Sequence, residues 1–271
     1  MRRLGLHLLD LPLYKGKGKI VVTYNGCDAR QKYPTMDRVS FSACHDKNCY
    51  GGICSSSDRD EMKRKRITKF DRYADAIFAV NPDLIYFLPK RTSFLPYAIS
   101  DWDSIETVPY HGTGRSLKIV HSPTNRAAKG SDLILQCLEQ AQKKYGEAIE
   151  VILVENLPNA EARRVYSQAD LCIDQILIGW YGGFAVELMK MGKPVMSFVR
   201  EEDLQFIPKA MAEDCEKAVV RVEPASLCER LCELIENRDL LLRYREAGLD
   251  YVQKWHDPVH VARMTKAVYE S

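Results

Sequence analysis

The C-terminal half of the chain alternates short apolar runs with segments of helical periodicity, and this alternation constrains the fold most strongly. Residues 131–145 show it best: Leu133, Ile134, Cys137, Leu138 and Ala141 recur at helical spacing. We expect strands at residues 117–120, 149–154, 171–173, 194–198 and 218–222. We expect helices at residues 131–145, 159–167, 184–191, 224–235 and 238–255, and one more after Pro258. Strands and helices that alternate in this way form βαβ units, which predicts a parallel sheet with helices on both faces.

The N-terminal part has the same α/β character but fewer units. Its expected elements are a helix at residues 4–14, a strand at 20–23, a basic helix at 59–73, a strand at 76–80 and a helical turn at 83–87. Residues 89–114 are rich in Pro, Asp, Ser and Gly, which is typical of a linker. We therefore expect an N-terminal domain at 1–110, a second domain at 111–257, and a C-terminal helix at 258–271 that packs back on the first domain.

The size and composition of the chain indicate a globular protein. Its 271 residues are 46% hydrophobic and 28% charged, which is enough to bury a core and excludes a disordered tail. No apolar run reaches the roughly 20 residues that cross a bilayer. His7 and Asp10 interrupt the apolar start, and no small-residue cleavage site follows. These features predict a cytoplasmic location.

The positive charge of the chain is concentrated in its first part. Residues 1–110 carry 18 Lys and Arg against 13 Asp and Glu, whereas the remainder carries 21 against 24. Part of the excess lies in the run Lys63-Arg64-Lys65-Arg66, which we interpret first as a solvated helix face. The same run is compatible with an anionic acceptor or with peripheral association with a membrane. No signature of a nucleic-acid-binding module accompanies it, so we expect no nucleic-acid partner.

Seven of the nine cysteines fall into two groups. We interpret Cys137, Cys172, Cys228 and Cys232 as small core residues. Cys44, His45, Cys49 and Cys54 are clustered in a Gly/Ser-rich loop, and thiolates and imidazoles are the ligands that zinc prefers. Their spacing lacks the tight C-x2-C pair of most zinc sites. We therefore expect a reduced loop or a disulfide there, with structural zinc as an alternative.

Two loops of the C-terminal half have the composition of a binding site. Arg126, Lys129 and Gly130 follow a strand and precede a helix, so two cations and free helix amides face one space, which suits an anion such as a diphosphate. In the second loop, Gly182 and Gly183 open a helix and permit close backbone approach, and Glu187 lies one turn further. A carboxylate at that position accepts hydrogen bonds from a sugar diol. Both loops would lie at the carboxyl edge of the sheet, where parallel sheets bind ligands.

Residues 166–198 resemble the nucleotide-sugar site of the group 1 (family 4) glycosyltransferases of GT-B fold. Tyr181 and Gly182 resemble the aromatic-glycine pair of that family, Glu187 the second glutamate of its E-x7-E motif, and residues 192–195 its Gly-x-Pro-Val run. Arg126, Lys129 and Gly130 resemble its phosphate clamp at a shorter spacing. Residues 25–30 resemble an H-G-x-D-x-R turn, with Asn25 in the place of the histidine.

The resemblance implies two Rossmann-like domains and transfer of a sugar from a UDP- or GDP-linked donor to a glycan or lipid-linked acceptor, with retention of configuration. The enzyme would act in polysaccharide biosynthesis and would require no metal or organic cofactor. The diphosphate would lie on Arg126, Lys129, Gly130 and the amides near Gly182 and Gly183. Tyr181 and Phe184 would belong to the same donor site, and Glu187 would bind the ribose. Asp28 would orient or deprotonate the acceptor, unless it only caps its own turn.

Two departures from the family pattern lead to alternatives. The first glutamate of E-x7-E would fall at Gly179, so Asp174 or Gln175 would have to substitute for it. The N-terminal domain has only about half of the expected βα units, so it is incomplete. Both departures favour a second hypothesis, a catalytically degenerate relative that serves as a nucleotide-sugar-binding or assembly module. A third hypothesis is an epimerase that acts on the same donors. The pattern predicts no particular oligomeric state.

Overall fold

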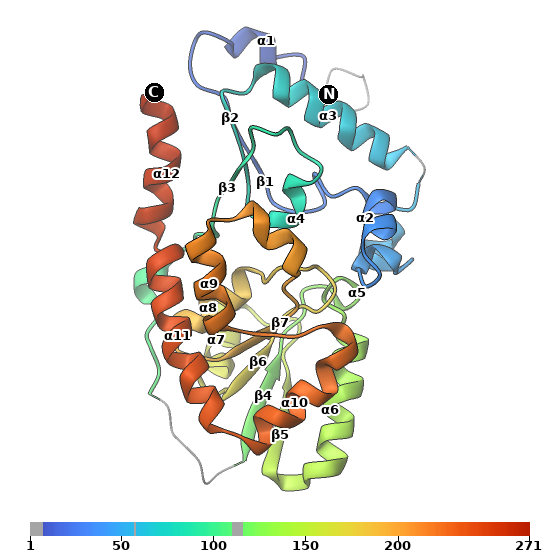
Figure 1. The fold of residues 1–271 in the computed structure, drawn as a ribbon, viewed down its shortest axis with the longest axis vertical. Helices are drawn as coiled ribbons and strands as arrows, with labels where there is room; N and C mark the ends of the chain where they lie inside the picture. Colours follow the sequence, from blue (N-terminus) through green and yellow to red (C-terminus); the bar gives the residue numbers. More distant parts are fainter. Residues whose placement is uncertain (1–7, 57, 110–115) are drawn as a thin grey trace.

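The protein contains two parallel sheets, one above the other along its long axis (Figure 1). The computed structural model describes residues 8–56, 58–109 and 116–271. The N-terminal sheet has the order β1-β2-β3, with β1 at Val21–Tyr24, β2 at Ala76–Ala79 and β3 at Ser93–Phe94. The helices of this part are α1 (Leu11–Tyr14), α2 (Lys32–Arg38), α3 (Arg59–Tyr73) and α4 (Pro82–Ile85).

The C-terminal sheet has the order β5-β4-β6-β7-β8, and all of its pairings are parallel. Its strands are β4 (Leu117–His121), β5 (Ile149–Leu153), β6 (Leu171–Ile173), β7 (Val195–Ser197) and β8 (Val219–Arg221). Its helices are α5 (Arg126–Lys129), α6 (Ser131–Tyr145), α7 (Asn159–Ser167), α8 (Gly183–Lys190), α9 (Lys209–Ala218), α10 (Leu227–Glu236) and α11 (Asp239–Trp255). The sequence prediction of an α/β architecture is confirmed.

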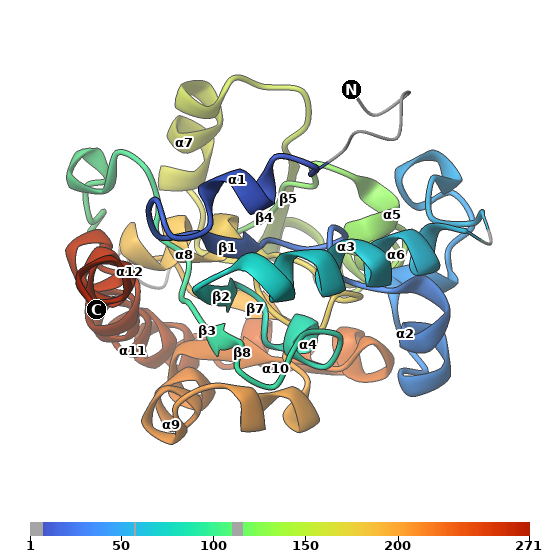
Figure 2. The same cartoon turned by 90° about the horizontal axis from the view of Figure 1, so that it is seen from above.

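Helices cover both faces of the C-terminal sheet, as the view from above shows (Figure 2). Successive strand residues point to opposite faces, so Ile119 packs with residues of α6 and α10, whereas Val120 packs with residues of α8, α9 and α11. Both side chains are fully buried. The inner strand β6 is apolar and buried along its whole length because both of its faces are covered.

The last helix, α12 (Pro258–Glu270), leaves the C-terminal domain and runs beside the N-terminal sheet (Figure 1). Val261 on this helix is buried together with Phe78 of β2 and Leu95. Asp257 caps the helix, since its carboxylate accepts the amides of Val259 and His260. The chain therefore crosses between the domains a second time at residues 256–257.

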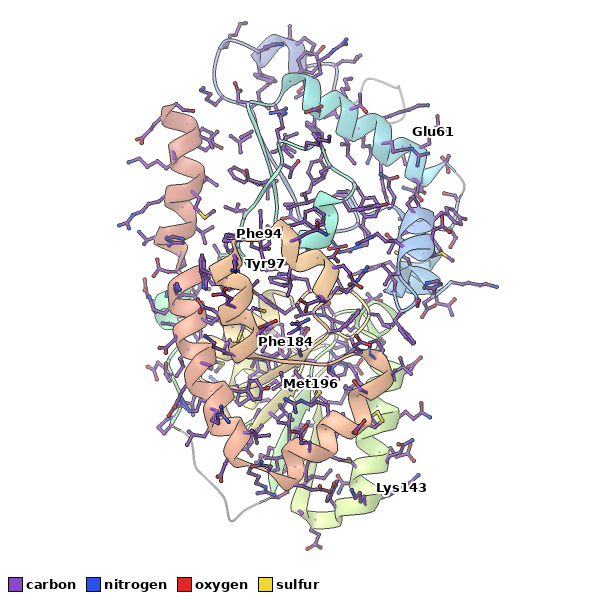
Figure 3. All side chains as sticks on the ribbon, in the orientation of Figure 1. Glu61, Phe94, Tyr97, Lys143, Phe184 and Met196 are labelled. Carbon is purple, nitrogen blue, oxygen red and sulfur yellow. A yellow bond between two sulfur atoms is a disulfide. The ribbon has the colours of Figure 1, made fainter. Side chains whose placement is uncertain are left out.

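Residues 89–114, which the sequence indicated as a linker, also contribute to both domains. Phe94 forms β3, and its ring meets Trp180 edge-on at a centroid distance of 5.9 Å. Trp102 and Ile105 are buried in the core of the C-terminal domain. Phe94 and Tyr97 lie where the two domains meet (Figure 3). The expected domain boundary at residues 110–111 lies outside the described residues.

Several local elements differ from the sequence prediction. The first helix covers only Leu11–Tyr14, while residues 4–7 of the expected 4–14 segment lie outside the described residues. The structure adds β3, the one-turn helix α5 and the helix α9. The sequence analysis missed α9 because only Met211, Cys215 and Ala218 of this ten-residue helix are buried, a weak apolar stripe.

Cys137 and Cys228 pack in the core, as expected, but they are not two separate thiols. The structure joins them in a disulfide that links α6 to α10, with a Cα–Cα distance of 5.1 Å. Cys172 is buried, as expected, and Cys232 is half-buried. The two bonded cysteines are 91 residues apart in the sequence, so local periodicity contains no signal for their pairing.

The basic run of α3 is not a uniformly solvated face. Lys63 is buried, and its amine donates to the carbonyl of Arg30 at 2.6 Å. Lys65 is exposed and pairs with Glu61 one turn away. Within the described residues, every helix is too short or too polar to cross a lipid bilayer.

Candidate active site

A cavity of about 690 Å³ lies between the two domains. Its N-terminal wall is formed by the turn after β1 and by the 3-10 segments at residues 43–45 and 49–52. Its C-terminal wall is formed by loops that follow β4 and β6, at the carboxyl edge of the sheet. Parallel α/β sheets bind ligands at this edge. Of the donor-site and acceptor-site residues predicted from sequence, Asp28, Lys129 and Gly182 line the cavity.

Three groups converge on one point of the C-terminal wall. The amine of Lys129 lies 2.6 Å from Oδ1 of Asp174, and the Gly182 amide donates to Oδ2 of the same carboxylate at 2.7 Å. The Asp174 side chain is fully buried. A carboxylate thus occupies a place that a lysine and a helix N-terminus make attractive to any anion.

Gly130 positions Lys129 through backbone packing. It has φ +76°, and a Cβ added there would lie 2.7 Å from the side chain of Ile176. The Lys129 carbonyl also accepts the Ile176 amide at 3.1 Å. Only glycine fits this close approach between the loops after β4 and β6. Sequence reasoning placed Gly130 in a phosphate clamp, and the structure gives it this packing contact.

The structure holds Arg126 away from the cavity. The guanidinium is exposed and forms two hydrogen bonds with the carboxylate of Glu155, at 2.7 Å and 2.5 Å. Asn125 caps the one-turn helix α5, accepting the Ala128 amide at 2.9 Å. Arg126 lies on the same turn as Lys129 but points to the loop after β5. Its role toward a diphosphate stays a prediction.

Glu187 and Phe184 lie on α8 outside the cavity lining. The Glu187 carboxylate is buried and pairs with Arg163 on α7. The Phe184 ring packs edge-on against Tyr166 at a centroid distance of 5.1 Å. Gly183 begins α8, and the N-cap residue, Gly182, has no side chain that could cap the helix. The predicted contacts of these residues with a nucleotide stay predictions.

Tyr181 belongs to a buried hydrogen-bonded network. Its hydroxyl lies 2.5 Å from the hydroxyl of Tyr251 and 2.9 Å from Nε2 of His256, while Nδ1 of His256 donates to the Tyr97 carbonyl at 2.8 Å. Burial lowers the pKa of His256 to about 4. The Tyr181 side chain is fully buried, and both Tyr251 and His256 bond to its hydroxyl. Its assignment to the donor site stays a prediction.

The backbone at Gly179 does not suit the glutamate that the E-x7-E motif has at this position. Gly179 has φ +88°, which side chains rarely adopt, and an added Cβ would lie 2.8 Å from Cδ of Arg200. Arg200 is itself buried beside this turn. Asp174, five residues earlier, is the buried carboxylate nearest in sequence to this position. The sequence analysis had named it as one substitute.

The turn after β1 is organised by Asp28. Its carboxylate accepts the backbone amides of Asn25, Gly26 and Ala29, at distances of 3.1, 2.8 and 3.0 Å. Asp28 therefore caps its own turn, as the structural alternative from the sequence predicted. Asp28 also lines the cavity and remains exposed, so the same carboxylate faces the space opposite Lys129. Its role toward an acceptor stays a prediction.

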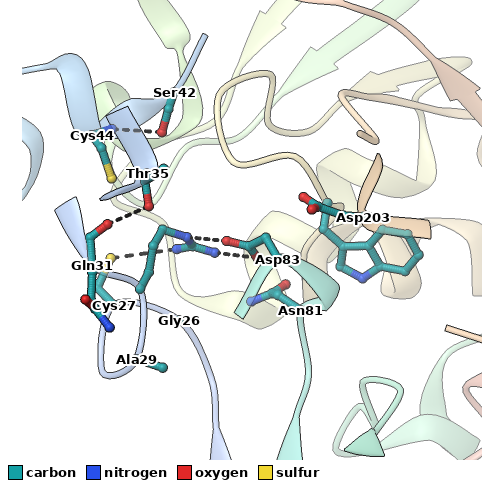
Figure 4. Close-up of polar contacts among 12 residues, drawn as sticks. Gly26, Cys27, Ala29, Gln31, Thr35, Ser42, Cys44, Asn81, Asp83 and Asp203 are labelled. Atoms are coloured by element: carbon teal, nitrogen blue, oxygen red, sulfur yellow. Dashed lines mark hydrogen bonds and ion pairs between the residues drawn. The ribbon is translucent and has the colours of Figure 1, made fainter. Parts of the chain in front are cut away.

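A buried ion pair fixes this turn to α4. Arg30 donates to Asp83 through Nε at 2.6 Å and through Nη2 at 3.0 Å, and its Nη1 lies 3.8 Å from the sulfur of Cys27 (Figure 4). Both charged side chains are almost fully buried. Two parallel hydrogen bonds hold the guanidinium in one orientation.

The predicted cysteine loop forms part of the same cavity. Cys44, Cys49 and Cys54 line it together with Cys27, which the sequence analysis did not single out. His45 instead bonds to the Val39 carbonyl at 2.9 Å. No group of three or more His, Cys, Asp and Glu among the described residues could hold a metal ion. The structure thus gives the zinc alternative no support.

His121, at the end of β4, serves packing. Its Nδ1 lies 2.9 Å from the Ile173 carbonyl, and its Nε2 lies 2.8 Å from the hydroxyl of Ser131. Burial lowers the pKa of His121, so the ring is neutral at pH 7. His121 is therefore a structural hydrogen-bonding residue.

No family model and no curated protein sequence matches the chain. Solved structures do match it in fold. HepE from Anabaena, in complex with UDP and glucose, superimposes with a TM-score of 0.60 at 13% identity over 93% of this chain and 72% of that one. The chain has a GT-B fold. Compared with such neighbours, its N-terminal sheet is shortened.

Two further GT-B structures are similar. Sucrose-phosphate synthase from Thermosynechococcus elongatus has a TM-score of 0.59 at 16% identity, over 92% of this chain and 67% of that one. A TarM variant of S. aureus, in complex with fondaparinux, alpha-GlcNAc-glycerol and UDP, has a TM-score of 0.58 at 14% identity over 78% of this chain. The chain spans 47% of that TarM chain, so it corresponds to about half of its length.

Proposed function

We propose that the protein is a glycosyltransferase that moves a sugar from a nucleotide diphospho-sugar to a glycan or lipid-linked acceptor, with retention. The observation that carries the proposal is the convergence of Lys129 and the Gly182 amide on one anion-binding point. This point lies in the interdomain cavity of a GT-B fold. The turn of Asp28 faces it from the other domain.

Asp174 supports the proposal because its carboxylate has the two-oxygen geometry of part of a phosphate. It satisfies Lys129 and Gly182 in the structure, at 2.6 Å and 2.7 Å. A diphosphate that bound there would take over both hydrogen bonds and release the carboxylate toward the sugar. Asp174 would then bind sugar hydroxyls in place of the glutamate that is absent at Gly179.

The reaction itself requires stabilisation of the leaving group. As the bond between the anomeric carbon and the diphosphate oxygen breaks, negative charge accumulates on the diphosphate. Lys129 and the N-terminus of α8 are fixed in position before this happens, so they stabilise the charge without reorganisation. Asp28 would orient the acceptor hydroxyl or accept its proton. Glu187 would release its partner Arg163 and bind the ribose instead.

The acceptor side of the cavity has apolar surface. Tyr50 and Ile53 are both more than half exposed, and both line the cavity. On the outer side of the N-terminal domain, Leu13 and Tyr14 of α1 are exposed beside the basic helix α3 (Figure 2). Apolar side chains next to lysines suit a lipid surface. These features favour the lipid-linked form of acceptor, and co-sedimentation with anionic vesicles tests the association.

The decisive experiment measures donor binding and turnover separately. Calorimetry with UDP and GDP should detect binding to the unmodified protein, and Lys129→Ala should weaken it at least tenfold, because charged hydrogen bonds contribute about 1.5–3 kcal/mol. Lys143→Ala is the matched control, since Lys143 is exposed at the far end of the molecule (Figure 3). A panel of nucleotide sugars, with glycan and lipid-linked acceptors, then measures transfer. Absence of binding to any nucleotide diphosphate would refute the proposal.

A second candidate function is a nucleotide-sugar-binding module without catalysis. The absent glutamate at Gly179 and the shortened N-terminal sheet favour it. Binding of the donor without nucleotide release, across both classes of acceptor, would establish this function in place of the first.

A further inference from the structure

The cavity contains a pair of cysteines that the proposed transfer reaction does not use. Cys27 lies in the turn after β1, and Cys54 follows the 3-10 segment at residues 49–52. Both residues line the cavity, although they come from separate loops of its N-terminal wall, and Arg30 and Lys63, which bond to each other, each contact one of the two sulfurs. Neither cysteine is part of the Cys137–Cys228 disulfide, and Cys27 is exposed.

Two buried cations flank this pair. Nη1 of Arg30 lies 3.8 Å from the sulfur of Cys27, and the amine of Lys63 lies 3.7 Å from the sulfur of Cys54. Both cations are fixed, Arg30 by Asp83 and Lys63 by the Arg30 carbonyl at 2.6 Å. Positive charge held beside a thiol favours its thiolate form.

The four thiols of the cavity therefore differ in reactivity. A hydrogen bond from Cys54 and the charges of Arg30 and Lys63 hold the pKa of Cys27 well below its usual range. Burial raises the pKa of Cys44, and it raises the pKa of Cys49 to about 11. Thiolates are the nucleophilic form, so Cys27 is the thiol of this cavity that reacts first at neutral pH.

We propose that Cys27 is an oxidation site that takes a peroxide and then forms a disulfide with Cys54. The Cys27 thiolate attacks one peroxide oxygen; the O–O bond breaks, and hydroxide (from hydrogen peroxide) leaves a sulfenic acid on Cys27. The sulfur of Cys54 then attacks the sulfenic sulfur, the S–S bond forms and the S–O bond breaks. The departing hydroxide takes the proton of Cys54 and leaves as water. The two thiols supply the two electrons that reduce the peroxide.

The disulfide would join two parts of the cavity wall. Cys27 is adjacent to Asp28, and Cys54 is adjacent in space to Lys63, so the bond would tie the turn after β1 to the 49–54 loop. This inference does not depend on the transferase proposal, because it concerns only the reactivity of the N-terminal wall. If the cavity binds an acceptor, oxidation would restrict the movement of that wall.

The test is peptide mapping of the full chain after treatment with hydrogen peroxide. We expect a linked pair of peptides that contains Cys27 and Cys54, with a loss of 2 Da (about two hydrogens) that dithiothreitol reverses. Before oxidation, limiting iodoacetamide at pH 6.5 should alkylate Cys27 at least tenfold faster than Cys49, which lines the same cavity. This second readout uses the unmodified protein and requires no variant.

Variants separate the two steps. Cys54→Ser should stop the reaction at the sulfenic acid, which dimedone traps on Cys27, whereas Cys27→Ser should abolish the linked peptide. Cys49→Ser is the matched control and should leave the Cys27–Cys54 linkage intact. Preferential linkage of Cys27 to Cys44 or Cys49, equal alkylation of Cys27 and Cys49, or stoichiometric zinc bound to these thiols would each overturn the proposal.

Discussion

Lys129 and Asp174 form an ion pair at 2.6 Å on the wall of the interdomain cavity, and the carboxylate of this pair also accepts the Gly182 amide. The pair joins the loop after β4 to the loop after β6, two neighbouring strands of the sheet. In the proposed function a diphosphate replaces the carboxylate. The Asp174 carboxylate and the diphosphate would therefore compete for Lys129 and the Gly182 amide.

Asp174→Asn tests this competition. Removing the internal negative charge leaves Lys129 without an ionic partner, so UDP should bind more tightly, by several-fold in calorimetry. Transfer should fall at the same time, because Asp174 no longer contacts the sugar as an anion. Weaker UDP binding in Asp174→Asn, with an unchanged circular dichroism spectrum, would contradict the displacement model.

Variants of Arg126 and of its partner Glu155 should change the affinity for UDP in opposite directions. Glu155 holds Arg126 through two hydrogen bonds on the protein surface. Glu155→Gln should weaken this pair and raise the affinity for UDP, whereas Arg126→Ala should lower that affinity; both effects should be modest because the site is exposed to solvent. If neither variant changes the titration curve, Arg126 does not contribute to the site.

Placing the glutamate of the E-x7-E motif at position 179 should not help this protein. Gly179→Glu and Gly179→Ala place a side chain at φ +88°, against Arg200, which should lower the free energy of unfolding by about 1–3 kcal/mol. Gly18→Ala is the control, since an added Cβ there meets nothing within 4 Å. Urea titration measures both. Higher transfer activity in Gly179→Glu would show that Asp174 has not taken over the role of the glutamate.

The buried His256 predicts a loss of stability in acid. Its pKa is lowered from 6.5 to about 4 by burial, so between these pH values the unfolded chain binds a proton that the folded chain does not. Stability should therefore fall as the pH drops from 6.5 toward 4, by about 3 kcal/mol in total. Urea midpoints at several pH values measure this slope. His256→Gln should flatten it, whereas His260→Gln, an exposed control on α12, should leave it unchanged.

The Cys137–Cys228 disulfide predicts a specific thiol count. Seven of the nine cysteines are unpaired in the structure, so denatured, unreduced protein should react with seven equivalents of a thiol reagent, and reduced protein with nine. Reduction should lower the free energy of unfolding by about 2–4 kcal/mol. Cys232→Ser should not change the reduction-dependent loss. The protein has to be purified without reductant for this count, because reducing conditions keep cysteines as free thiols.

The sequence by itself determined most of the elements and their class. The bounds of α3, α7 and β6 agree with the prediction from residue patterns. This agreement has a physical reason: the period of apolar residues and the positions of Gly and Pro act over a few neighbouring residues. The same local signals placed Lys129 and Gly182 at the ends of elements, and the rule for parallel sheets then brought both to one edge.

Only the tertiary structure decided which side chains face the cavity. It turned Arg126 toward Glu155, buried Tyr181 against Tyr251 and His256, and gave the position beside Lys129 to Asp174. It also paired Cys137 with Cys228 and brought Cys27 to Cys54. Each of these contacts joins residues more than 25 positions apart. The packing of whole elements decides which residues become neighbours. The residue pattern within one element does not contain that information.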